Sequence, residues 1–98
     1  MFRIIDKRGS GKTSRLMLIA KEYENTLFVC GNPKAMEQKA HAYGITGIEF
    51  ISYYDFLDVN KWRGTERRNV VIDEIEPFIR HLNPCLDLIG YSISEDDL

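Results

Sequence analysis

The feature that most constrains how this chain can fold is the stretch DKRGSGKT at residues 6–13. It follows a short apolar run at residues 2–5 and opens a segment whose apolar residues recur at helical spacing. We therefore expect a buried strand, a glycine loop and a helix, because glycine reaches backbone conformations that other residues avoid. In that arrangement successive backbone N–H groups point inward at the positive end of the helix dipole, which makes a cradle for an anion.

The residues of this loop predict a polyphosphate as the anion. Lys12 would reach the β- and γ-phosphates, and the Thr13 hydroxyl would hold Mg²⁺. In the full signature, G-x-x-x-x-G-K-[ST], the first position is glycine, whereas this chain has Asp6. Aspartate tolerates the left-handed conformation better than most residues, so we expect the turn to form. The expected nucleotide-binding residues are Gly9, Ser10, Gly11, Lys12, Thr13 and Ser14.

A second motif, VVIDE at residues 70–74, lies about sixty residues further along. Its β-branched run predicts a buried strand that delivers two acids at its carboxyl end. Asp73 would serve Mg²⁺ together with Thr13, directly or through water. Glu74 is expected to polarise the water that attacks the γ-phosphate, so Glu74 and Lys12 are the predicted catalytic residues.

The spacing of apolar runs and turn residues predicts one α/β domain over residues 1–98. The alternation favours a three-layer fold, with a parallel sheet of about five strands and helices on both faces. Ligands of such sheets bind at the carboxyl ends of the strands, where the glycine loop would lie. Strands are expected at 2–6, 26–30, within 45–52, at 70–72 and within 86–93, and helices at about 11–24, 33–43, 53–59 and 76–82.

Composition places few further limits on function. The net charge of −2 gives no sign of a nucleic-acid or membrane partner for the chain as a whole. The apolar runs are too short to span a bilayer, and Met1 leads into a predicted strand rather than a signal peptide. Cys30 and Cys85 match no metal-binding spacing, so we expect reduced thiols in a cytoplasmic protein, with Cys30 in the core.

With GSGKT and IDEIEPF together, the chain resembles P-loop NTPases of the group with an additional strand and a catalytic glutamate. Within that group it is most similar to the first RecA-like half of a superfamily-one helicase, or to a small phage-encoded ATPase. The resemblance implies the P-loop NTPase fold, binding of ATP or another NTP with Mg²⁺, and slow hydrolysis within an assembly or on a partner. It also implies a polar sensor at the end of the last strand, for which Ser92 and Ser94 are the candidates. A helicase motor needs two RecA-like domains. The 98 residues of this sequence are expected to form only one, so this chain by itself is not expected to be a complete motor.

The polar stretch NKWRGTERRN at residues 60–69 is the most basic part of the chain. It is open to three interpretations: a solvated loop, an arginine finger offered to a neighbouring subunit or another protein, or phosphate contacts to nucleic acid. In the third interpretation Trp62 would stack on a base. The residues concerned are Lys61, Trp62, Arg63, Arg67 and Arg68.

Two other functions compete with the NTPase hypothesis. The first is a binding module, that is, an adaptor or inhibitor whose binding is gated by nucleotide or which no longer binds nucleotide. Asp6 in place of the first glycine favours this alternative. The second is a nucleoside or nucleotide kinase. In thymidine kinases the corresponding strand also ends in Asp-Glu, and aromatic residues follow. Those enzymes use a lid and a zinc-bound lasso with paired cysteines, and the sequence has no such segment.

Overall fold

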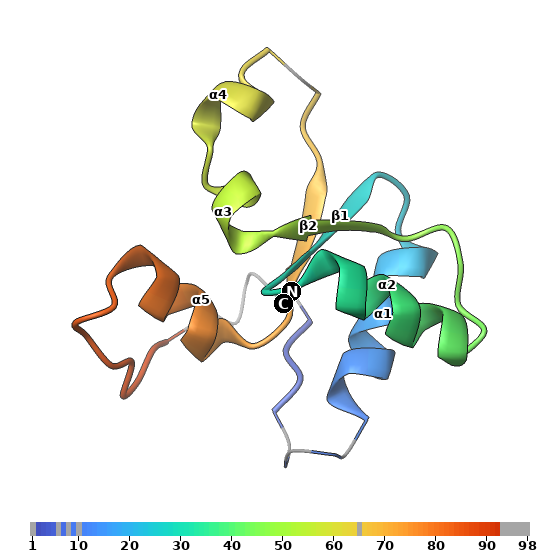
Figure 1. Cartoon of the computed structure of the whole chain (residues 1–98), viewed down its shortest axis with the longest axis horizontal. Helices are drawn as coiled ribbons and strands as arrows, with labels where there is room; N and C mark the ends of the chain where they lie inside the picture. The colour runs from blue at the N-terminus through green and yellow to red at the C-terminus, as the bar shows by residue number, and fades with distance from the viewer. Residues whose placement is uncertain (1, 6, 8, 10, 65, 93–98) are drawn as a thin grey trace.

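A sheet of three parallel strands lies at the centre of the molecule (Figure 1), in the order β2-β1-β3. The computed structural model describes residues 2–5, 7, 9, 11–64 and 66–92. The middle strand is buried along its whole length, with Val29 paired to Ile51 on one side and to Ile72 on the other. The elements are α1 (Lys12–Glu22), β1 (Thr26–Cys30), α2 (Pro33–Ala42), β2 (Glu49–Ser52), α3 (Tyr53–Phe56), α4 (Val59–Trp62), β3 (Asn69–Ile72) and α5 (Ile75–Leu82).

Each face of the sheet has its own core, because alternate residues of a strand point to opposite faces. On one face Phe28 and Cys30 pack with Met17 of α1 and Ala40 of α2. On the other face Val29 packs with Tyr53 of α3 and Phe78 of α5. Figure 1 shows α1 and α2 together on one side of the strands and α5 on the opposite side. The helices thus cover both faces, as the α/β pattern predicts.

The local signals for α2 act as expected. The Asn32 side chain accepts a hydrogen bond from the backbone N–H of Ala35 at 3.1 Å, and Pro33 takes the first helical position. Gly44 follows the helix with a φ of +74°, a conformation that glycine adopts without steric cost. These three residues mark both ends of α2 through local contacts and backbone preferences.

The apolar spacing over residues 16–23 predicts a core stripe of Leu16, Ile19, Ala20 and Tyr23, and α1 follows it in part: Ala20 is buried and Leu16 packs against the core. Met17 is fully buried, whereas Tyr23 is 45% exposed. The helix ends at Glu22 and Tyr23 is already extended, so helical spacing does not reach it. The buried side of α1 therefore follows Met17 and Ala20, and extending it by one turn toward the N-terminus brings Thr13 to the same face.

Two predicted strands are not formed in the described part of the chain. Residues 2–5 and 86–92 have no strand pairing, which leaves three strands where about five were expected. Ile5 is 74% exposed and Ile89 is wholly exposed. An apolar run signals burial but does not specify a ladder partner, and Gly90 weakens the second run as a strand. The Phe2 ring packs edge-on against Tyr23, with 5.4 Å between centroids, so Phe2 lies against the residue that follows α1.

The segment expected to be one short helix over 53–59 is two separate turns. Ser52 caps the first by accepting from the backbone N–H of Asp55, and Asp58 caps the second by accepting from that of Asn60. The second turn, α4, continues to Trp62, inside the stretch expected to be a polar break. The Trp62 indole donates hydrogen bonds to two carbonyls of the first turn, which holds the two turns together.

Candidate functional site

The first part of the site is the start of α1, where the glycine loop meets the helix. Gly9 and Gly11 have φ values of +81° and +85°, and Gly11 stands immediately before the helix. Side chains rarely adopt this conformation, so glycine is required at both positions. Gly11 has no side chain to cap the first turn, and the first backbone N–H groups of a helix have no partners within it. Asp6, Arg8 and Ser10 of the predicted loop lie outside the described residues.

The next residues of α1 show how the helix start is ordered. The Ser14 hydroxyl donates to the Gly11 carbonyl at 3.0 Å, and the backbone N–H of Arg15 donates to the same oxygen at 3.1 Å. Ser14 is thus occupied with its own helix turn, whereas Thr13 points toward the sheet. Of the six predicted nucleotide-binding residues, the structure describes Gly9, Gly11, Lys12, Thr13 and Ser14.

The second part of the site is the carboxyl end of β3. The backbone N–H of Asp73 donates to the Val29 carbonyl at 2.9 Å, which extends the strand pairing past Ile72. The Thr13 hydroxyl donates to the Asp73 carboxylate, with 3.2 Å between Oγ1 and Oδ1. These two residues are 60 positions apart in the chain. The structure therefore brings together the hydroxyl and the carboxylate that the sequence assigned to one metal ion.

Electrostatics at Asp73 follow from partial burial. Burial raises the pKa of its carboxyl group, and the neighbouring Glu74 carboxylate adds to that rise. The Thr13 hydrogen bond and the charges of Lys39 and Lys12 act in the opposite direction. Lys12 of α1 and Lys39 of α2 are thus close enough to contribute to the potential at this carboxylate. A cation placed beside Asp73 would favour its charged form in the same way.

Glu74 occupies an unusual backbone position. Its φ is +61° and its ψ is 86°, values that are sterically costly for a residue with a side chain. It is exposed, and its side chain makes no capping bond to α5. The predicted catalytic carboxylate thus stands at the open rim of the carboxyl edge of the sheet, one residue beyond Asp73.

The sequence analysis missed Tyr53, which is part of the same edge. This residue is 8% exposed, and its hydroxyl donates to the carbonyl of Asp73 at 2.6 Å and to that of Glu74 at 3.3 Å. Burial, with the nearby acids, raises the pKa of Tyr53 to about 12, so the phenol keeps its proton at neutral pH. The signal that could have found it is position, because Tyr53 directly follows β2 and parallel strands end at one edge.

Cys30 ends β1 at this edge and is fully buried, as the sequence predicted. Burial, and next the charge of Asp73, raises the pKa of its thiol to about 11. Cys85 is exposed. The predicted sensor is not placed: Ser92 is exposed in an irregular segment, and Ser94 lies outside the described residues.

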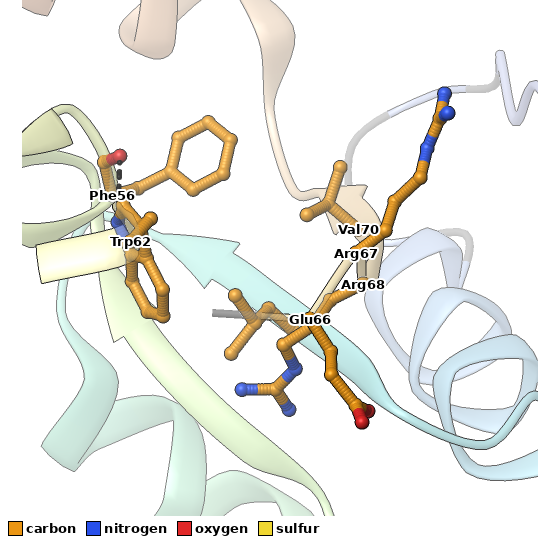
Figure 2. Close-up of a pocket in the computed structure, with 7 residues that line it drawn as sticks. Phe56, Trp62, Glu66, Arg67, Arg68 and Val70 are labelled. Atoms are coloured by element: carbon orange, nitrogen blue, oxygen red, sulfur yellow. Dashed lines mark hydrogen bonds between the residues drawn. The ribbon is translucent and has the colours of Figure 1, made fainter. Parts of the chain in front are cut away.

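The predicted basic surface lies at the other end of the sheet, where the strands begin. A groove of about 280 Å³ opens there, with Leu27 and Val70 at the starts of β1 and β3. Phe56 and Trp62 lie across this groove from Val70 (Figure 2). The groove is lined by Leu27, Phe56, Trp62, Glu66, Arg67, Arg68 and Val70.

Two of the four basic residues of this surface are already paired with acids. The Lys61 ammonium lies 2.9 Å from the Asp55 carboxylate, and the Arg68 guanidinium lies 2.6 Å from that of Glu49. Arg67 lines the groove, whereas Lys61 and Arg63 do not. The structure thus brings Trp62, Arg67 and Arg68 together but offsets much of the positive charge that the sequence suggested.

Among the residues that the structure covers, no three His, Cys, Asp or Glu side chains gather into a metal site. No helix in the described ranges is long and apolar enough to cross a membrane. Comparisons of the chain with protein-family models, with curated proteins and with solved structures give no match.

Proposed function

We propose that this chain binds ATP or another nucleoside triphosphate together with Mg²⁺ and hydrolyses it slowly, on the fold of a P-loop NTPase. The observation that carries the proposal is the 3.2 Å hydrogen bond from Thr13 to Asp73, two residues that are 60 positions apart in the sequence. The glycine motif and the acidic motif were assigned to one metal from the sequence alone. Their contact in the fold is what a shared ligand requires.

The chemistry of the pair fits Mg²⁺. This ion prefers oxygen ligands, and its protein sites commonly use one or two side chains completed by phosphate oxygens and water. Thr13 and Asp73 supply a hydroxyl and a partly desolvated carboxylate beside the expected position of the phosphates. When bound, the ion would neutralise charge on the phosphate oxygens.

The loop at residues 9–14 would hold the phosphates. Gly9 and Gly11 already have the left-handed φ values that let a backbone turn its N–H groups toward an anion. Lys12 begins α1, and its charge already contributes to the potential at Asp73, so its ammonium would be available to the phosphates at this edge. Glu74 would orient the attacking water from the rim of the edge.

The proposal includes a partner molecule that supplies an arginine finger. Arg67 and Arg68 line the groove at the amino end of the sheet, and Arg63 precedes them in the same basic stretch. Arg68 is five residues before Asp73, which is about 17 Å along an extended strand. An arginine finger would therefore come from another copy of the chain or from a different protein. Nucleic acid bound through Trp62 and the arginines is the other partner that the sequence suggested, and the ion pairs at Lys61 and Arg68 leave less charge for it.

Calorimetric titration with ATP, with Mg²⁺ present and then chelated, tests the proposal. Asp73→Asn should weaken Mg²⁺-dependent ATP binding by about 10- to 100-fold, the range for losing one charged interaction. Asp87→Asn is the matched control, because Asp87 is exposed and contacts Arg80 rather than the site. Equal ATP affinity in wild type and Asp73→Asn, with and without Mg²⁺, would refute the shared metal.

Phosphate release by the same proteins separates the proposal from its alternative. Binding without turnover above background, with or without single-stranded DNA, would indicate a nucleotide-gated binding module. Turnover that rises with DNA would support a nucleic-acid partner.

A further inference from the structure

The hydroxyl of Tyr53 ties together the two ends of the sheet's carboxyl edge. Tyr53 follows β2, which is separated from β3 by β1. Its ring passes beside Gly31 at the end of β1, where an added Cβ would lie 3.6 Å from the ring. The hydroxyl then reaches the carbonyls of Asp73 and Glu74 beyond β3. One buried side chain thus spans the carboxyl edge of the sheet from β2 to β3.

The two bonded carbonyls are those on either side of the Glu74 Cα. The Asp73 carbonyl belongs to the peptide plane that precedes Glu74, and the Glu74 carbonyl belongs to the plane that follows it. Anchoring both planes fixes φ and ψ of Glu74, whose φ of +61° is uncommon for any residue but glycine. Such a conformation persists only where the surroundings hold it. The Tyr53 hydroxyl hydrogen-bonds to both planes, and the Glu74 carbonyl also accepts from the backbone N–H of Phe78 at 3.4 Å, the first bond of α5.

Packing makes the hydroxyl a rigid anchor. The Tyr53 ring lies edge-on to Phe78 of α5, with 5.4 Å between the ring centroids. The centroid of the His81 ring lies 6.1 Å away. α5 begins directly after Glu74. The ring therefore holds the helix that follows Glu74 while the hydroxyl holds the turn that precedes it.

We infer that Tyr53 is a positioning residue that sets the direction of the Glu74 carboxylate through the backbone of residues 73 and 74. The inference rests on the proposed function, in which Glu74 orients the attacking water. Asp73 is held independently, by its strand bond to Val29 and by Thr13. Loss of the Tyr53 hydroxyl should therefore affect turnover more than nucleotide binding.

Tyr53→Phe is the test, because it removes the hydroxyl and keeps the ring contacts. We expect kcat to fall at least about tenfold, while the Kd for ATP with Mg²⁺ stays within about twofold. Tyr54→Phe is the matched control: Tyr54 is the next residue and is 72% exposed. Wild-type kcat in Tyr53→Phe would overturn the inference. So would a parallel loss of kcat and ATP affinity, since that would show a general structural role.

A double-mutant comparison asks whether Tyr53 acts through Glu74. In a Glu74→Gln background, Tyr53→Phe should cause little further loss of kcat, because residues that act as a unit are not additive. Independent, multiplying losses would contradict the inference.

A spectroscopic measurement distinguishes failure of this inference from failure of the proposed function. If wild type does not bind ATP, the proposed function is wrong whatever Tyr53 does. Backbone NMR shifts of Glu74 and Ile75 still report the tether: Tyr53→Phe should move them and Tyr54→Phe should not. Unchanged shifts in Tyr53→Phe would overturn the tether itself.

Discussion

The two ends of this parallel sheet hold polar groups in contrasting ways. At the carboxyl end, Thr13 and Tyr53 come from separate segments and both donate to Asp73, Thr13 to its carboxylate and Tyr53 to its backbone carbonyl. At the amino end, Lys61 and Arg68 meet acids in exposed or half-exposed ion pairs around an open groove. The same strands supply both ends, so the difference lies in what the fold places over them.

This difference shows which polar residues the fold holds in a fixed arrangement. Exposed ion pairs contribute about 0–1 kcal/mol, because water screens them and two long side chains lose freedom. Hydrogen bonds in partly buried surroundings are held more tightly and are costly to leave unmade. The basic stretch is prominent in the sequence, yet the less conspicuous Thr13, Tyr53 and Asp73 form the connected network.

The largest expected effect is on the rate of ATP hydrolysis, compared between a variant at the carboxyl end of the sheet and one at the amino end. Glu74→Gln keeps the size of the side chain but removes the base, so hydrolysis at saturating ATP should fall by roughly a hundred- to ten-thousandfold. Binding of ATP should stay unchanged or become tighter, because one negative charge near the phosphates is gone. Glu66→Gln at the groove is the control, and phosphate release is the measurement. Equal rates in the two variants would remove Glu74 from the mechanism.

Affinity gives the second contrast, with a lysine from each end. Lys12→Ala should weaken ATP binding by about 10- to 100-fold, because it deletes a cation aimed at the phosphates. Lys61→Ala removes an exposed lysine that pairs with Asp55, and ATP affinity should not change. Titration with ATP and Mg²⁺ measures both, and circular dichroism checks that both fold. ATP affinity at the wild-type level in a folded Lys12→Ala protein would sink the phosphate-loop assignment.

Stability gives the third contrast, with two valines on one face of the sheet. Val29 is fully buried under α3 and α5, whereas Val70 at the groove is 43% exposed. Val29→Ala should lower the free energy of unfolding by about 2 kcal/mol, because a buried cavity remains. Val70→Ala should change it by no more than about 0.5 kcal/mol. Urea unfolding measures both, and a Val70→Ala cost as large as that of Val29→Ala would show that the groove is closed in solution.

The smallest effect concerns alkaline pH. Burial raises the pKa of Cys30 from 9.0 to about 11, so the unfolded thiol loses its proton first as the pH rises. The stability that this thiol contributes is fully present below pH 9 and is lost between pH 9 and about pH 11. At pH 10 the loss should be about 1 kcal/mol. Melting curves from pH 8 to 10 should fall less steeply for Cys30→Ala than for wild type, and Cys85→Ala should match wild type.

Local signals in the sequence determined the elements whose ends are set by their own residues. Asn32, Pro33 and Gly44 bound α2, and the apolar runs at 26–30 and 70–72 form β1 and most of β3. Gly9 and Gly11 take the positive φ values that the motif requires. The carboxyl-edge position of Asp73 also followed, because a β-branched run in an α/β pattern delivers its next residue there. Each of these depends on backbone preferences and hydrophobicity that short stretches carry by themselves.

Tertiary structure decided everything that depends on partners distant in the chain. Apolar runs at 2–5 and 86–92 predicted strands but did not supply a neighbour to pair with, and the structure leaves them outside the sheet. The fold buries Met17 and leaves Tyr23 exposed, and it brings Thr13 to Asp73, which is 60 residues away in the chain. Tyr53 reads as an ordinary aromatic residue in the sequence, and its role at the edge exists only because β2 and β3 end together. Hydrogen bonds and packing across the sheet join residues whose spacing no local pattern records.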